Sequence, residues 1–193
     1  MDFILSFLMS IIFVSLCSMV IISIRILLAK YLRSERYNYR HHIAPCISLY
    51  TRHKDLMRQQ LALTSWSSLV DLWCGDGSAL RFFSQYYNLR SLEGFDTNSV
   101  AIWRGKITNL CNHNNIHLFT QNFLSVDLQK YDYIYLFLLP KQLDDIQEWL
   151  QKNMRPDTVI ICNTFLFTKR KPYQELWSHD SKSVIRLYKK EIR

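Results

Sequence analysis

The chain has 193 residues, of which 49% are hydrophobic and 21% charged, and this composition excludes an intrinsically disordered protein. Its five cysteines form no C-x-x-C motif or close pair, so we predict neither a disulfide framework nor a metal site. The net charge of +8 is concentrated in two regions, +6 in residues 25–58 and +5 in residues 165–193. The rest of the chain is acidic on balance, which argues against a nucleic-acid partner.

A long uncharged run lies near the N-terminus. Residues 3–24 contain no charged side chain, and about 20 apolar residues in a helix span the roughly 30 Å of a bilayer core. A cleaved signal peptide would have a basic start and a shorter apolar stretch, and no base precedes this run. We therefore predict a single-pass transmembrane anchor within residues 1–29. A buried core helix stays open as an alternative.

The basic residues near this run all follow it. They are Arg25, Lys30, Arg33, Arg36 and Arg40. Because positive charge marks the cytoplasmic side of a membrane helix, we predict that the rest of the chain faces the cytoplasm. Residues 30–45 form a basic juxtamembrane connector, which we expect to lie against anionic head groups.

Residues 46–193 are predicted to be one domain in which strands and helices alternate. We expect strands at 69–72, 91–95, 116–120, 131–139, 158–163 and 184–189, and helices at 49–63, 78–87, 99–111 and 142–152. The nearly continuous apolar run of 131–139 is typical of a strand that is covered on both faces. Alternation of this kind predicts an α/β fold with a doubly wound, mostly parallel sheet.

Two of the four glycines stand together between a predicted strand and a predicted helix. Gly75 and Gly77 flank Asp76, where glycine permits a sharp turn and a close approach of the backbone to a ligand. Asp96 follows Gly77 by 19 residues and ends the next predicted strand. An acid at this distance can accept hydrogen bonds from two ribose hydroxyls. The pattern therefore predicts a site for a nucleoside-containing ligand.

The segment Asp71-Leu72-Trp73-Cys74-Gly75-Asp76-Gly77 resembles the first motif of class I S-adenosylmethionine methyltransferases. Gly94-Phe95-Asp96-Thr97-Asn98 is similar to the second motif, Gln121-Asn122-Phe123 to the adenine-side segment, and residues 131–140 to the fourth strand with its motif beside the methyl group. The nearest subgroup is the small, membrane-anchored methyltransferases related to the ATP-synthase c-subunit lysine methyltransferase family. The resemblance extends over residues 44–190.

This resemblance implies a Rossmann-like fold with S-adenosyl-L-methionine as the cofactor. It implies a methyl-transfer site beside Pro140 and the cofactor-binding residues Asp71, Trp73, Cys74, Gly75, Asp76, Gly77, Asp96, Asn98, Asn122 and Phe123. The chain departs from the family pattern at two of these positions. Trp73 replaces a motif glycine, and Asn122 replaces an acid that accepts from the adenine amino group.

The function that we predict is methylation of a protein, on lysine, at or in the membrane, by a monomeric enzyme. The membrane anchor favours this function, because tethering raises the local concentration of membrane substrates. Two alternatives remain at this point. One is a lipid or other small-molecule methyltransferase, and the other is a binding protein that keeps the fold but has lost catalysis through Trp73.

Overall fold

The structure is a computed structural model that describes residues 9, 12–26, 51–112 and 115–191. The chain forms two compact units, residues 1–45 and 46–193. In the first unit residues 12–26 are helical, and the large hydrophobic side chains of this helix are each more than half exposed. Within the described ranges, no helix combines the length and the apolar character needed to cross a membrane. The predicted connector, residues 30–45, and much of the predicted anchor lie outside the described residues.

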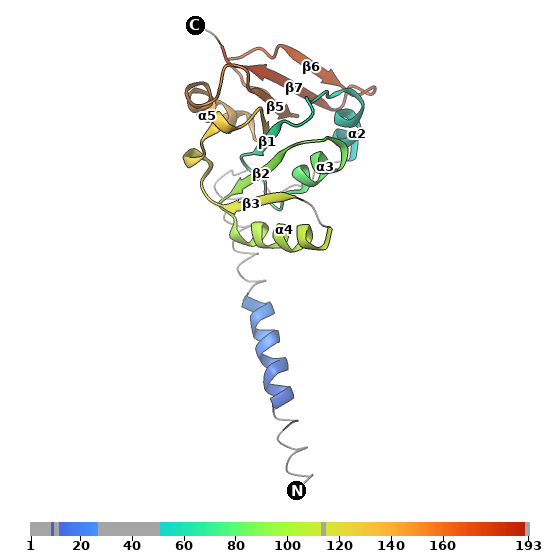
Figure 1. Ribbon diagram of the computed structural model, residues 1–193, viewed down its shortest axis with the longest axis vertical. Coiled ribbons are helices and arrows are strands. Elements are labelled where there is room, and N and C mark those ends of the chain that lie inside the picture. The colour runs from blue at the N-terminus through green and yellow to red at the C-terminus, as the bar shows by residue number, and fades with distance from the viewer. Residues whose placement is uncertain (1–8, 10–11, 27–50, 113–114, 192–193) are drawn as a thin grey trace. The chain divides into compact units, whose positions relative to one another are not determined.

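The second unit is built on a seven-stranded sheet (Figure 1). Its strands are β1 (Ser68–Asp71), β2 (Ser91–Asp96), β3 (Ile116–Thr120), β4 (Tyr133–Leu136), β5 (Val159–Asn163), β6 (Gln174–Trp177) and β7 (Val184–Lys189). Their order across the sheet is β3-β2-β1-β4-β5-β7-β6. The first five strands are parallel to one another, whereas β7 runs antiparallel to both β5 and β6.

In residues 51–112 and 115–191, four α-helices accompany the sheet: α2 (Thr51–Gln60), α3 (Ser78–Tyr86), α4 (Ser99–Asn112) and α5 (Pro140–Asn153). The chain moves one way along the sheet from β1 to β3 and the opposite way from β4 to β5, so right-handed crossovers place α3 and α4 on one face and α5 on the other. Figure 1 shows α3 and α5 on opposite sides of the strands. Two short 3₁₀ turns, η1 (Phe123–Ser125) and η2 (Leu128–Lys130), connect β3 to β4.

Burial follows from this double cover. All four residues of β1 and of β4 are buried, as is typical of strands that are covered on both faces, although β1 includes the polar residues Ser68 and Asp71. On one face the core joins Leu56 and Met57 of α2 to Phe83 of α3 and to Tyr133 and Tyr135 of β4. Helix α3 has the amphipathic pattern of a surface helix, with Ala79, Leu80, Phe82 and Phe83 buried.

The prediction of a mostly parallel α/β sheet is confirmed, but one strand was missed and another is shorter than expected. Strand β6 was not predicted, because only Leu176 of its four residues is buried and the apolar signal is too weak. The strand expected at 131–139 is limited to Tyr133–Leu136. The Tyr131 hydroxyl donates instead to Glu93 Oε2 at 2.6 Å, and the chain leaves the sheet after Leu136.

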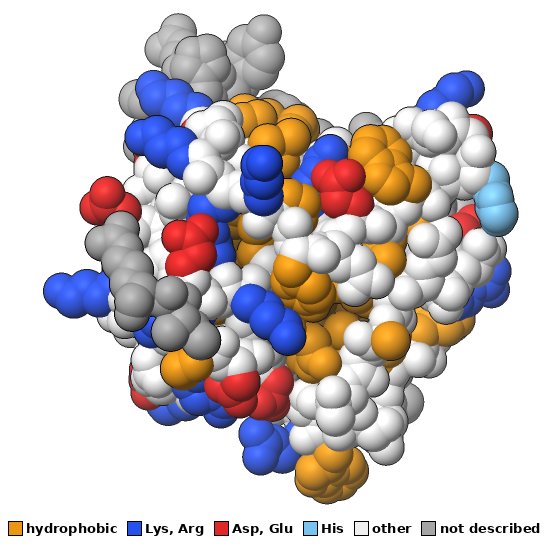
Figure 2. All heavy atoms as spheres, turned by 90° about the horizontal axis from the view of Figure 1, so that it is seen from above, with side chains coloured by type: hydrophobic (Ala, Val, Ile, Leu, Met, Phe, Trp, Pro, Cys, Tyr) orange, Lys and Arg blue, Asp and Glu red, His pale blue; other side chains and the backbone are white. Residues whose placement is uncertain are grey.

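Figure 2 views the molecule from above, onto the end that carries β6 and β7 in Figure 1. Hydrophobic side chains gather in the middle of this face, with lysines, arginines and acids around them. Contacts between cations and aromatic rings occur in this part of the sheet. Lys189 Nζ lies 5.1 Å from the ring centre of Tyr173, and the Arg186 guanidinium lies 5.7 Å from that of Trp177.

Candidate cofactor site

The predicted site residues of the first two motifs meet at one edge of the sheet. Strands β1 and β2 are parallel, and Asp71 pairs with Gly94, so Asp71 and Asp96 end neighbouring strands at the same edge. The loop 72–77 leads from β1 into α3 at this edge. In open α/β sheets, ligands bind outside the carboxyl ends of the strands, beside the point where strand order reverses. Here the order reverses between β1 and β4.

Both glycines of the turn need the conformation that glycine provides. Gly75 has φ +55° and Gly77 has φ +78°, in the left-handed region that side chains disfavour. A Cβ on Gly77 would lie 3.1–3.2 Å from the methyl groups of Leu118 on β3. Gly77 is therefore required for two reasons, its backbone conformation and its packing against Leu118. The sequence pattern had predicted a different reason, the close approach of the backbone to a ligand.

Asp96 holds the turn by its carboxylate. Its Oδ2 accepts from Gly75 N at 2.8 Å, and its Oδ1 accepts from Asn98 N at 2.8 Å. Burial raises the pKa of this carboxyl, and the hydrogen bonds from Asn98, Gly75 and Thr97 oppose the rise. Each carboxylate oxygen has a second lone pair, so Asp96 can still accept from two ligand hydroxyls.

Asn98 offers a second polar group at this edge. Its Oδ1 accepts from the backbone of Val100 and Ala101 at the start of α4, at 3.2 and 3.1 Å. Its Nδ2 is buried and has no hydrogen-bond partner. A buried donor of this kind is costly until a ligand or water satisfies it. Together with Asp96 and the glycine turn, this donor fits the hydroxyl-rich nucleoside of S-adenosylmethionine.

Asp71 is the most perturbed acid of the site. Burial raises its pKa to about 7, its hydrogen bond from Trp73 N at 3.1 Å acts against that rise, and the nearby charge of Asp96 adds to it. A carboxyl with such a pKa is half ionised near neutrality. A cation held beside it would favour the ionised form.

The raised pKa of Asp71 predicts a specific pH dependence of stability. Between its ordinary pKa of 3.8 and the folded value of about 7, the folded state binds more protons than the unfolded state, so Asp71 makes stability fall as pH rises through this window. The full contribution is about 4 kcal/mol. We expect Asp71→Asn to remove this loss of stability. The free energy of unfolding in urea should therefore fall from pH 5 to pH 8 by more in the parent than in the variant. The same change in the free energy of unfolding between the two pH values in both proteins would contradict a raised pKa of Asp71.

The Trp73 ring packs against an aromatic side chain of η1. Its ring centre lies 4.5 Å from that of Phe123 in η1, and Phe123 in turn contacts Trp149 of α5 at 5.3 Å. Asn122 caps η1, because its Oδ1 accepts from Leu124 N at 3.0 Å. The structure therefore brings Trp73 and Phe123 together, and the bulky indole at the glycine position is accommodated in an aromatic cluster beside α5.

Two other predicted residues stabilise the scaffold. Cys74 is buried, and its backbone N–H donates to Phe95 O at 3.1 Å. The Asp76 carboxylate forms ion pairs with Arg81 of α3 at 3.3 Å and with Arg104 of α4 at 3.2 Å. Asp76 thus fastens the turn to two helices.

Pro140 begins α5 immediately after the exit from β4, as the first residue of the helix. The missing N–H of proline is harmless at this position. Leu139 N donates to Gln142 Oε1 at 3.2 Å, which completes the start of the helix. The segment from Phe137 to Pro140 therefore lies at the same edge of the sheet as the glycine turn, beside β1.

The sequence reasoning missed two features of this edge. Gly105 of α4 lies against the turn, and a Cβ there would lie 2.4 Å from Asp76 O. A scarce glycine inside a predicted helix was the available signal. The second is Thr164, directly after β5, which has φ +67°. No signal in the sequence marks that conformation.

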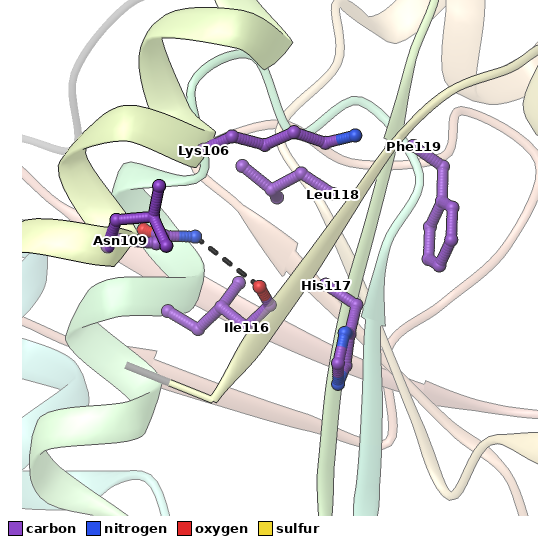
Figure 3. A pocket seen from close by; sticks show the side chains of 7 residues that line it. Lys106, Asn109, Ile116, His117, Leu118 and Phe119 are labelled. Atoms are coloured by element: carbon purple, nitrogen blue, oxygen red, sulfur yellow. Dashed lines mark hydrogen bonds between the residues drawn. The ribbon is translucent and has the colours of Figure 1, made fainter. Parts of the chain in front are cut away.

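A separate cavity of about 500 Å³ lies along the outer edge of the sheet (Figure 3). Lys106, Asn109 and Leu110 of α4 and Ile116, His117, Leu118 and Phe119 of β3 line it. Asn109 Nδ2 donates to Ile116 O at 3.5 Å, as Figure 3 shows. No predicted cofactor-binding residue lines this cavity.

Three solved structures with the same fold carry the name of a methyltransferase or methylase. An RNA methyltransferase from Salinibacter ruber in complex with S-adenosyl-L-homocysteine has a TM-score of 0.67 and 14% identity, covering 76% of this chain and 97% of that one. A putative methyltransferase from Escherichia coli, yhhF, has a TM-score of 0.57 and 14% identity, covering 77% and 90%. A ribosomal protein L11 methylase from Lactobacillus delbrueckii subsp. bulgaricus has a TM-score of 0.57 and 13% identity, covering 72% and 77%.

The sequence itself gives the family. The family described as "ANTKMT methyltransferase domain" matches residues 71–174, more than half of the chain. No curated protein matches the sequence. The matched region begins at Asp71 and contains the glycine turn, Asp96 and the exit from β4. The chain belongs to the ANTKMT methyltransferase domain family and is an S-adenosylmethionine-dependent methyltransferase.

Proposed function

We infer that this enzyme methylates lysine side chains of a protein located at or in a membrane, and that its own N-terminal segment tethers it there. The observation that carries the inference is the helix at residues 12–26, whose hydrophobic side chains are exposed on all sides. A helix that is apolar all round needs lipid or another protein to cover it. The uncharged run of residues 3–24, followed only by basic residues, supports a lipid environment.

The choice of lysine rests on the resemblance to the ATP-synthase c-subunit lysine methyltransferase family. S-adenosylmethionine supplies an electrophilic methyl group, so the chain has only to align a nucleophile and exclude water. Asp96, Asn98 and the turn at Gly75 would hold the cofactor. Phe137 and Leu139, at the exit from β4, border the region where a nucleophile would approach, and they give it an apolar character. Apolar surroundings favour the neutral, reactive form of an amine.

The position of Trp73 supports an intact enzyme. Its ring is accommodated in the cluster with Phe123 and Trp149, and the backbone of the glycine turn keeps its hydrogen bond to Asp96. Loss of catalysis through a blocked turn would need the indole to lie over Gly75 and Asp96. Because Phe123 is itself a predicted cofactor-binding residue, the Trp73 ring borders the cofactor site at its adenine side.

Product analysis tests the proposed function. The full-length protein, with methyl-labelled S-adenosylmethionine, is incubated separately with solubilised membrane proteins, with extracted lipids and with RNA from its own cell. We expect label in the protein fraction, recovered as methylated lysine after hydrolysis, and we expect the protein itself to stay in the membrane pellet after a carbonate wash. Label confined to lipid or RNA would overturn the substrate class, and release into the supernatant would overturn the tether.

A further inference from the structure

The chain makes a strained bend directly after β5. Thr164 has φ +67°, in the left-handed region, and it is the one β-branched residue among the described non-glycine residues with positive φ. Such a conformation costs about 1–3 kcal/mol and persists only where the surroundings fix it. Bends of this kind concentrate at functional sites, and this one lies at the ligand-binding edge of the sheet.

Four hydrogen bonds fix Thr164. Its N–H donates to Val184 O at 2.9 Å, and its carbonyl accepts from Arg186 Nη1 at 2.6 Å. Its hydroxyl donates to Asn163 Oδ1 at 3.1 Å and lies 3.1 Å from His53 Nε2. Because the single hydroxyl proton is used on Asn163, we assign the proton of this last bond to His53 Nε2.

The two groups that hold the bend from outside come from distant elements. His53 is a buried residue of α2, more than a hundred residues before Thr164 in the chain. Arg186 lies on β7, and its Nε is fixed by Glu175 Oε1 of β6 at 2.6 Å. The same hydrogen-bond chain continues inward, because Asn163 Nδ2 donates to the Tyr135 hydroxyl of β4 at 2.8 Å.

The bend determines where Phe165 lies. Phe165 N donates to Asn163 O at 2.8 Å, which turns the chain back at once, and its ring stacks on Phe137 with 5.9 Å between centres and 18° between planes. Both rings are partly exposed. Phe137 directly follows β4, and β4 pairs in parallel with β1, the strand that leads into the cofactor turn. The two rings thus form one aromatic wall beside the cofactor turn.

We propose that Phe137 and Phe165 bind the lysine side chain that accepts the methyl group, and that His53 is a positioning residue that holds this wall through Thr164. The wall takes up the side chain as its ammonium form, which loses its proton to water before the neutral amine attacks the methyl group. This inference rests on the proposed lysine substrate. Aromatic faces attract alkylammonium ions and pack against methylene groups, so the wall suits a lysine side chain from Cβ to Nζ. His53 does not touch the substrate, and its effect passes through the bend.

Binding of n-butylamine, which copies the lysine side chain from Cβ outward, tests the wall without requiring catalysis. The full-length protein is saturated with S-adenosylhomocysteine, and calorimetry measures the dissociation constants of both ligands. We expect millimolar binding of n-butylamine, weaker binding of 1-butanol, and at least a fivefold loss for n-butylamine in Phe165→Leu. The dissociation constant of S-adenosylhomocysteine should change by less than twofold.

Two variants test the positioning role. His53→Leu and Thr164→Val each remove the hydrogen bond between His53 and the Thr164 hydroxyl, so both should weaken the binding of n-butylamine at least fivefold. His53→Gln restores a donor at this position and should bind n-butylamine as the parent does. Thr158→Val is the matched control, because it deletes a buried hydroxyl that donates to Tyr131 O at the start of β5, and it should bind n-butylamine as the parent does. Absence of n-butylamine binding in the parent, or unchanged binding in His53→Leu, overturns the proposal. The proposed function is judged separately, by the methylated product.

Discussion

Replacing Gly105 with alanine is expected to destabilise the protein by about 3 kcal/mol, although alanine is the better helix former by about 1 kcal/mol. The reason is the close approach of α4 to the cofactor turn. A Cβ on Gly105 would lie 2.4 Å from Asp76 O and 2.6 Å from a methyl group of Leu118. The first neighbour is backbone, which cannot rotate away, so the helix and the turn must separate. Urea unfolding of the full-length protein measures the change.

The same separation should also weaken binding of S-adenosylhomocysteine, by more than tenfold, because the turn that it displaces is joined to Asp96 through Gly75. Lys106→Ala is the control, since Lys106 is exposed on the next position of the same helix. That variant should leave both the free energy of unfolding and the affinity nearly unchanged. A Gly105→Ala protein as stable as the parent would show that α4 does not press on the turn.

The parallel part of the sheet was predictable because its strands are buried on both faces. The apolar runs around Ile134 and Ile160 leave no polar side that could face water, and the shorter run at Leu69 and Val70 is followed by the glycine turn. Strand β6 could not be predicted in this way. Three of its four residues are exposed, and what makes it a strand is its pairing with β7, which the sequence does not display.

The sequence predicted where in the sheet the candidate site lies, but not how its side chains are arranged. The spacing between Gly77 and Asp96 placed both at one edge of the sheet, and the structure joins Asp96 to the turn through Gly75. The side-chain directions were not predictable. Asp76 turns to Arg81 and Arg104 of two helices, and Thr164 depends on His53 from α2. Such contacts join residues that are far apart in sequence, so no local pattern records them.

Asp96→Ala is expected to weaken binding of S-adenosylhomocysteine by ten- to a hundredfold. Hydrogen bonds from ligand hydroxyls to a carboxylate contribute about 1.5–3 kcal/mol, which corresponds to this range of affinity. The variant also loses the bonds that Asp96 accepts from Gly75 N and Asn98 N, both at 2.8 Å, so the turn loosens as well. Calorimetry on the full-length protein gives the dissociation constant, and thermal unfolding reports on the turn.

A second substitution separates the two roles of Asp96. Asparagine keeps one acceptor oxygen and removes the buried charge, whose desolvation raises the pKa of Asp96. Asp96→Asn should therefore lose less thermal stability than Asp96→Ala and still bind S-adenosylhomocysteine about tenfold more weakly. Asp127→Ala is the control, because Asp127 likewise accepts from a backbone N–H two residues on, that of Gln129 at 3.1 Å, but lies in the connection before β4. Its loss should leave the affinity unchanged. If Asp96→Asn binds as tightly as the parent, the carboxylate serves the turn alone, and the ribose must be held by other groups at this edge.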